Sequence, residues 1–209
     1  MTRYFDAELI GKYSQSGPRY TSYPTAVEFH ERFTAVDYVR HLEAGNAAAR
    51  DLSLYVHIPF CEHVCYYCGC NKIITRNHDQ SDEYLDQLER DIARQAAHID
   101  KSRRVIQLHL GGGTPTFLNH DQLRRLLAML HEHFPHFAAD DAGEYSIEID
   151  PRTVSPDDLR FLRELGFNRV SFGVQDFDPA VQQAVNRIQS FEHVRDTIAA
   201  ARAAGYHSI

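Results

Sequence analysis

The stretch Tyr55-Val-His-Ile-Pro-Phe-Cys61-Glu-His-Val-Cys65-Tyr-Tyr-Cys68-Gly-Cys70 decides the fold of this chain. Three of its cysteines follow the spacing C-x3-C-x2-C, which places three thiols in one short loop. Soft thiolate ligands at this spacing select zinc or an iron–sulfur cluster over hard cations. A structural zinc ion is usually closed by four ligands. Three spaced thiolates therefore favour a [4Fe–4S] cluster in which one iron stays open for chemistry.

The cysteines could also form disulfides or a zinc site instead of binding a cluster. All four cysteines fall between Cys61 and Cys70, so disulfides among them could not staple a domain of this size. The first residues are interrupted by charge and show no apolar leader, and we therefore expect a reducing, cytoplasmic compartment. A zinc site stays open as an alternative, because Cys70, His57 or His63 could complete a four-ligand shell.

The composition bounds the class of protein. With 209 residues, 43% of them hydrophobic and 24% charged, the chain is typical of a globular protein that buries a core. The net charge of −7 argues against a partner such as nucleic acid or a membrane surface, since both need a basic face. No stretch of about 18 apolar residues is present, so we expect no membrane span. Nothing demands more than a monomer.

Apolar runs of strand length alternate with helical periodicities, which predicts βα units on a parallel sheet. Ser155-Pro156-Asp157-Asp158 predicts a helix start, with a cap, a proline at the first helical position and acidic residues in the first turn. A fifth strand is expected to begin at Tyr206, so the chain is expected to be truncated there. The expected strands are 52–59, 105–110, 145–150 and 169–175, and the other expected helices are 81–98, 121–134, 178–186 and 191–204.

Parallel βα units carry their functional loops at the carboxyl ends of the strands. The cysteine loop follows the first expected strand, and Gly111-Gly-Gly-Thr-Pro-Thr116 follows the second. Glu148 lies near the end of the third strand, and Gln175 is expected to end the fourth. These residues are therefore predicted to meet on one rim. We expect an N-terminal extension over 1–50, which could reach the substrate, and an incomplete core over 51–209.

The same segments carry a family resemblance. Together with Gly17-Pro-Arg-Tyr-Thr-Ser-Tyr-Pro-Thr25, Ser146-Ile-Glu-Ile-Asp-Pro-Arg152 and Gly173-Val-Gln-Asp-Phe177, they resemble the oxygen-independent coproporphyrinogen III oxidases, also called coproporphyrinogen III dehydrogenases, of the radical S-adenosylmethionine (SAM) superfamily. The cluster loop is shared by that large superfamily. The tyrosine- and proline-rich segment and the Cys-Gly-Cys ending are much narrower features.

The resemblance implies a partial (β/α) barrel and an oxidoreductase of porphyrin and haem biosynthesis, active in its full-length form. In that family, a radical derived from SAM abstracts hydrogen from the β-carbon of a propionate, and loss of carbon dioxide and one electron leaves a vinyl group. Two such reactions convert coproporphyrinogen III to protoporphyrinogen IX. The implied partners are coproporphyrinogen III and an electron donor of flavodoxin or ferredoxin type. A haem- or tetrapyrrole-binding protein without decarboxylase activity stays open as the alternative.

The resemblance also implies the site residues. It makes Cys61, Cys65 and Cys68 the ligands of the [4Fe–4S] cluster and leaves the catalytic residues unassigned. It implies two SAM molecules as further cofactors. The residues implied to contact SAM are Tyr55, Tyr67, Gly112, Gly113, Thr114, Glu148, Gln175 and Arg187. Judged from the sequence alone, Arg187 is instead expected to be a solvated arginine at a helix end.

Three residues outside that set carry hypotheses of their own. Cys70 has either a role beside the cluster or substrate or the role of a buried, inert thiol. His57 alternates with Tyr55 on the first strand, so both side chains are expected on one face. Arg19 is suited to capture a propionate, because a guanidinium pairs with a carboxylate through two hydrogen bonds.

Overall fold

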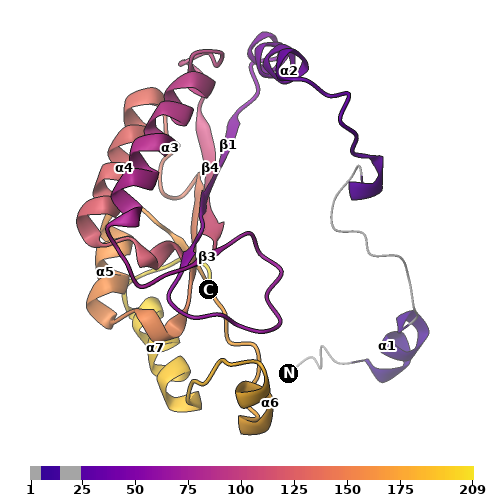
Figure 1. Cartoon of the computed structure of the whole chain (residues 1–209), viewed down its shortest axis with the longest axis vertical. Coiled ribbons are helices and arrows are strands. Elements are labelled where there is room, and N and C mark those ends of the chain that lie inside the picture. Colours follow the sequence, from indigo (N-terminus) through magenta and orange to yellow (C-terminus); the bar gives the residue numbers. More distant parts are fainter. Residues whose placement is uncertain (1–5, 15–24) are drawn as a thin grey trace. The chain divides into compact units, whose positions relative to one another are not determined.

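The computed structural model describes residues 6–14 and 25–209 (Figure 1). The chain divides into two compact units, Met1–Tyr38 and Val39–Ile209. In the first unit, α1 (Ala7–Tyr13) begins at Asp6, whose carboxylate accepts the backbone N–H groups of Glu8 and Leu9. A short 3-10 helix, η1 (Ala26–Glu28), follows, and α2 (Ala35–Ala47) crosses the boundary between the units.

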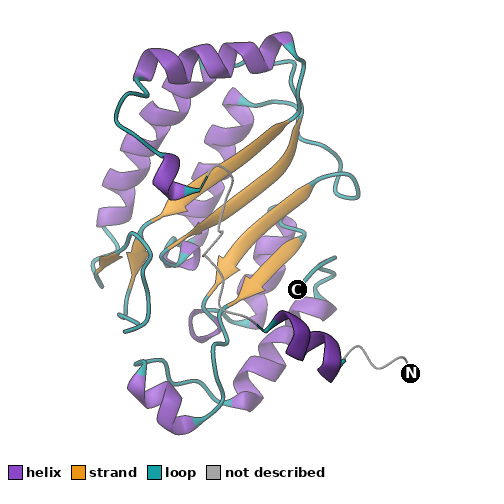
Figure 2. Ribbon diagram, turned by 90° about the vertical axis from the view of Figure 1, so that its right-hand side faces the viewer, coloured by secondary structure: helices purple, strands orange, loops and turns teal. Residues whose placement is uncertain are grey.

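The second unit is built on a four-stranded parallel sheet with the strand order β1-β4-β5-β6. All four arrowheads lie toward the same edge of the sheet, which we call the carboxyl edge (Figure 2). The strands are β1 (Leu52–Ile58), β4 (Val105–Gly112), β5 (Glu144–Ile149) and β6 (Arg169–Phe172). The main helices are α3 (Gln80–Ala96), α4 (His120–His133), α5 (Pro156–Glu164), α6 (Pro179–Ala184) and α7 (Phe191–Ala203). The 3-10 helices η2 (Pro115–Phe117) and η3 (Pro151–Thr153) and the two-residue strands β2 (Phe60–Cys61) and β3 (Ile73–Ile74) complete it.

The two faces of the sheet differ in chemistry. Helices α3, α4, α5 and α7 lie on one face (Figure 1), and the apolar side chains that alternate along the strands are buried beneath them. Ile58, Leu110 and Ile147 are 0% exposed there. Their neighbours in sequence, among them His57, His109 and Glu148, point to the opposite face and stay partly exposed. The apolar face therefore holds the fold together, and the polar face carries ionisable side chains that can bind a ligand.

The predicted alternation of strands and helices is confirmed. One predicted strand, the fourth, is shorter in the structure than the sequence indicated. The fourth expected strand was extended to Gln175, but β6 ends at Phe172. Beyond it the chain turns tightly, because the N–H groups of Val174 and Asp176 donate back to the carbonyls two residues earlier. Where a fifth strand was expected, Ser208 forms a parallel bridge with Arg169 of β6. No helix in the described part of the chain is long and apolar enough to cross a membrane.

Asn168 closes the turn between α5 and β6. Its side chain is 2% exposed, and its Oδ1 accepts the N–H of Tyr145 at 2.8 Å. Its Nδ2 donates to the carbonyls of Asp140 and Gly143, both at 2.8 Å. One amide thus pairs with three backbone groups, in the turn before β5 and at its start.

Replacing Asn168 with Leu should lower the free energy of unfolding by about 3 kcal/mol, because three backbone groups lose their partners. Urea unfolding followed by circular dichroism measures the change. Gln183→Ala, at an exposed position of α6, is the matched control and should stay within about 0.5 kcal/mol of the unsubstituted chain. A loss as small as the control's would show that water replaces the amide.

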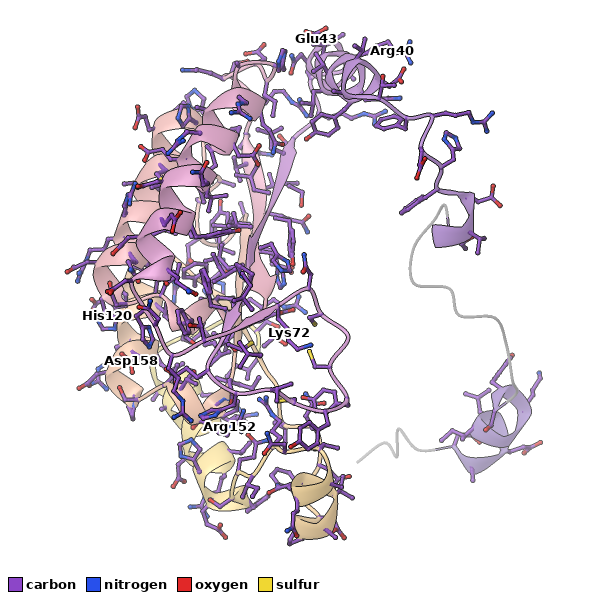
Figure 3. All side chains as sticks on the ribbon, viewed as in Figure 1. Arg40, Glu43, Lys72, His120, Arg152 and Asp158 are labelled. Carbon is purple, nitrogen blue, oxygen red and sulfur yellow. The ribbon has the colours of Figure 1, made fainter. Side chains whose placement is uncertain are left out.

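The start of α5 matches its sequence signature. Ser155 and Asp158 form a reciprocal capping box, and Asp158 also lies 2.8 Å from Nε2 of His120 on α4 (Figure 3). Burial acts to raise the pKa of Asp158, but the hydrogen bonds from Ser155 and the proximity of His120 outweigh it, so that this pKa is lowered.

A carboxylate whose pKa is lowered by folding stabilises the protein above its unfolded pKa, about 3.9 for aspartate, and loses that contribution as the pH falls through the folded pKa. Asp158→Ala should therefore cost about 1 kcal/mol of unfolding free energy near neutral pH. The difference from the unsubstituted protein should shrink below about pH 4. Unfolding free energies measured at several pH values test this prediction, with Asp157→Ala, at an exposed position, as the control. A penalty independent of pH would contradict this assignment.

Candidate active site

The cysteine loop leaves the sheet directly after β1. Its two ends are joined by the parallel pairing of β2 with β3, in which Cys61 lies opposite Ile74. Within the loop, the N–H of Cys68 donates to the carbonyl of Cys65 at 3.0 Å. The ammonium of Lys72 donates to the carbonyl of Cys68 at 2.8 Å (Figure 3). All four cysteines are free thiols. The backbone thus holds the loop in place without a disulfide.

A cavity of about 350 Å³ lies beside this loop at the carboxyl edge of the sheet. Most of the predicted site residues line it together: Cys61, Cys65, Cys68, Tyr67, Gly113, Thr114, Glu148, Gln175 and Arg187. Tyr55 and Gly112 lie outside its lining. A larger cavity, of about 470 Å³, is lined by parts of α4 and α5 and holds none of the predicted residues. The three spaced thiols line the cavity of about 350 Å³ together with charged side chains, and we therefore take this cavity as the candidate site.

The glycine turn after β4 packs tightly against the end of β1. A Cβ on Gly113 would lie 2.7 Å from the carbonyl oxygens of Pro59 and Phe60, so only glycine fits. Gly112 has a φ of +115°, and a Cβ there would meet the ring of His57 at 2.8 Å. The next residue, Thr114, brings its hydroxyl to 3.4 Å from Sγ of Cys61. Neighbours within the protein thus explain both glycines, and their expected contact with SAM stays a prediction.

Tyr55, His57, His109 and Glu148 form a connected group on the polar face of the sheet. The Tyr55 hydroxyl lies 3.0 Å from Nδ1 of His57, and the Tyr55 ring stacks on His109 with centroids 5.8 Å apart. Nε2 of His109 lies 3.3 Å from Oε1 of Glu148, whose other oxygen accepts the N–H of Gly112 at 3.3 Å. The expectation that His57 shares a face with Tyr55 is confirmed. Through these contacts, Tyr55 and Gly112 are connected to Glu148, which lines the cavity.

Arg187 is buried rather than solvated, so the expectation from sequence alone is wrong. Its side chain is 8% exposed, and its Nη2 lies 3.1 Å from Oδ1 of Asp150. The same guanidinium donates twice to the carbonyl of Gly173, and its Nη1 lies 3.5 Å from Sγ of Cys65. The carbonyl of Gly173, just after β6, and the carboxylate of Asp150, just after β5, thus replace water around the arginine.

Gln175 reaches the cavity from a turn rather than from a strand. Its φ of 66° is unusual for a residue with a side chain. A Cβ built on Gly173 would lie 3.3 Å from its side-chain nitrogen, so the amide lies over that glycine. The predicted position at the cavity wall is correct, whereas the strand that was to carry it is not.

The thiols of the loop experience different surroundings. Burial raises the pKa of Cys61, with the nearby Cys68 and Cys65 adding to the effect and the Thr114 hydroxyl opposing it. For Cys68, burial is outweighed by hydrogen bonds with Cys70 and by the Lys72 ammonium, so its pKa is lowered. Cys70 itself is exposed, which contradicts its interpretation as a buried, inert thiol. Its contact with Cys68 leaves a role beside the cluster.

Among the described residues, no set of three or more His, Cys, Asp or Glu side chains is arranged around a point that could hold a single metal ion. A [4Fe–4S] cluster has a different requirement, because each thiolate binds its own iron. The three spaced thiols line one cavity and lie close enough to influence the pKa of Cys61. The donor set therefore fits a cluster with three cysteine ligands.

Comparisons with known proteins show the family and the fold. The profile of the Radical SAM superfamily matches residues 55–209. The oxygen-independent coproporphyrinogen III oxidase of Pseudomonas aeruginosa is 53% identical over 98% of this chain. The protein of the same name from Mannheimia haemolytica is 53% identical over 70% of this chain and 97% of its own length. The chain belongs to the oxygen-independent coproporphyrinogen III oxidase family of radical SAM proteins.

The solved structure of coproporphyrinogen III oxidase from Escherichia coli, described as a radical SAM enzyme, superimposes with a TM-score of 0.83 at 47% identity. The match covers 98% of this chain and 44% of that one, and the chain likewise spans 44% of the Pseudomonas protein. The radical SAM fold with its parallel sheet is therefore confirmed. Membership of the family implies a [4Fe–4S] cluster and SAM as cofactors.

Sequence reasoning missed several residues of the site. Asp150 lines the cavity and pairs with both Arg187 and Arg152, and His109 joins Tyr55 to Glu148. His109 could have been found, since it follows Gln107 at strand spacing on the polar face. Asp150 ends a strand already expected, but nothing in the sequence announces its partner 37 positions later. The hypothesis about Arg19 falls outside the described residues.

Cys61→Ala, Cys65→Ala and Cys68→Ala should each abolish stable cluster assembly, because a cluster needs all three of these thiolates when SAM supplies the remaining ligand position. Cys70→Ala is the matched control and should keep most of the iron and sulfide. Anaerobic reconstitution followed by iron and sulfide analysis and visible absorption measures the difference. Equal loss in all four variants would remove the distinction between Cys70 and the others.

Proposed function

We propose that the protein catalyses the radical SAM decarboxylation of two propionate side chains of coproporphyrinogen III to vinyl groups, giving protoporphyrinogen IX. The observation that carries the proposal is the cavity in which three thiols, a carboxylate and a buried arginine meet at the carboxyl edge of a radical SAM sheet. The names of the Pseudomonas, Mannheimia and Escherichia relatives support the choice of substrate.

Cys61, Cys65 and Cys68 would hold three irons of the cluster and leave the fourth open. When bound, the cluster and SAM together supply one-electron chemistry that can remove a hydrogen atom from a C–H bond. The chain's own residues supply position and charge. Glu148 lines the cavity with one oxygen anchored by the Gly112 N–H, and its carboxylate would accept a hydrogen bond from the amino group of SAM.

The other expected contacts divide between two places. Tyr67, Gly113, Thr114, Gln175 and Arg187 line the cavity with the thiols. Tyr55 and Gly112 lie beyond its lining, joined to it by His109 and Glu148. This separation suits the proposal of two SAM molecules, one against the cavity wall and one toward the polar face of the sheet. Tyr55 is 59% exposed, and its aromatic ring offers a surface on which an adenine can stack.

The remaining partners are part of the proposal. A flavodoxin- or ferredoxin-type donor would deliver the electron, and a reducing, cytoplasmic compartment would keep the four cysteines as thiols. The net charge of −7 supports a protein that acts as a monomer without nucleic acid or membrane partners. An acidic protein that binds four propionates needs local cations, and Arg19 is the residue we propose from the N-terminal segment.

The test is an anaerobic incubation of the reconstituted protein at full length with SAM, a one-electron reductant and coproporphyrinogen III. We expect release of carbon dioxide and formation of protoporphyrinogen IX, and neither from Cys65→Ala. Glu148→Ala should weaken SAM binding about tenfold or more, since it removes a charge-assisted hydrogen bond worth about 1.4 kcal/mol or more. Gln183→Ala on α6 is the control. Tetrapyrrole binding without carbon dioxide release would favour the binding protein instead.

A further inference from the structure

Arg187 is a buried cation at the cavity. Its Nε and Nη2 both donate to the carbonyl of Gly173, at 3.1 and 2.7 Å, and Asp150 accepts from the same Nη2. A Cβ on Gly173 would lie 2.9 Å from Nη2, so this position must be glycine for the arginine to approach. The remaining nitrogen, Nη1, is directed at Sγ of Cys65 at 3.5 Å.

The charges around Arg187 do not cancel. Among the described residues, Asp150 is the one carboxylate that pairs with Arg187, and Arg152 shares it through hydrogen bonds of 2.6, 3.0 and 3.2 Å. Two guanidinium groups and one carboxylate leave a single positive charge, and the side chains of Asp150 and Arg187 are only 9% and 8% exposed. A buried charge needs a partner of opposite sign. The group toward which the remaining nitrogen of Arg187 points is the sulfur of Cys65, which would carry negative charge as a cluster ligand.

We propose that Asp150, Arg152 and Arg187, which we call the arginine clamp, make the iron–sulfur cluster easier to reduce through Cys65. The inference rests on the proposed function, because it takes Cys65 as a cluster ligand. Three thiolates around a doubly positive core carry one net negative charge, and one electron accepted from a low-potential donor doubles that charge. A fixed guanidinium attracts the reduced form more strongly than the oxidised one. Hydrogen bonds to cluster sulfurs and local charge are known determinants of cluster potentials.

The residue type suits this role. A guanidinium stays charged at any working pH, and its planar fork can hold Gly173, Asp150 and Cys65 at once. Because Arg187 is buried, salt in the solvent should screen its charge only weakly. Surface arginines share the charge and the planar fork but lack this burial. The arginine clamp therefore differs from the exposed ion pairs on α5 and α7, such as that of Arg195 with Asp196.

The experiment is a redox titration of the reconstituted cluster, followed by electron paramagnetic resonance, with no SAM present. Arg187→Met removes the charge but keeps the length of the side chain. We expect the equilibrium constant for reduction to fall about tenfold, which for one electron lowers the midpoint potential by about 59 mV. Arg187→Lys should lower the midpoint potential by less, since lysine keeps the positive charge but lacks the planar guanidinium fork. The shift should persist in about 1 M salt.

Two further variants decide the outcome. Arg152→Met should shift the potential in the same direction but less, because its side chain is 22% exposed. Arg195→Met on α7 is the control and should leave the potential unchanged. Unchanged potentials in both Arg187→Met and Arg152→Met, with normal iron and sulfide, would overturn the inference even if SAM binding weakened. If the unsubstituted protein assembles no cluster, the proposed function fails, and this inference fails with it.

Discussion

The candidate site depends on the parallel register between β1 and β4. This register sets His57 opposite Gly111 and Ile58 opposite Gly112, so the cysteine loop and the glycine turn leave the sheet side by side. Gly113 then donates its N–H to the carbonyl of Ile58 at 2.8 Å. A slip by one residue would exchange the two faces of β1 and carry Tyr55 into the apolar core. The register between β1 and β4 thus determines the position of the site residues as well as the packing of the sheet.

The sheet separates stability from function by alternation along each strand. His109 lies between Leu108 and Leu110, which are 1% and 0% exposed, yet its ring belongs to the polar face. Buried charges gather at the carboxyl edge, where Asp150 and Arg187 adjoin the thiol of Cys65. Burying such a pair has a desolvation cost that apolar side chains would not have. Its location beside the thiols therefore indicates a role in the site rather than in holding the core.

Local signals were read correctly where one segment contains the whole cause. The capping box of Ser155 and Asp158 and the ends of α7 follow from neighbouring residues alone. The end of β6 could not be predicted from neighbouring residues. Strand-like residues continue past Phe172, but β6 ends there, and the carbonyl of Gly173 accepts hydrogen bonds from Arg187. The exposure of Arg187 was likewise misjudged, since its partners Asp150 and Cys65 lie far away in the sequence.

The sequence by itself determined the alternation of strands and helices, the three spaced thiols and the rim on which Glu148 and Gln175 would meet them. Those features depend on periodicity and spacing, which act over a few residues. Only the tertiary structure decided which charges are buried and how they pair. It brought Asp150, Arg152 and Arg187 around the sulfur of Cys65, because long-range contacts between loops set desolvation, and no local pattern encodes them.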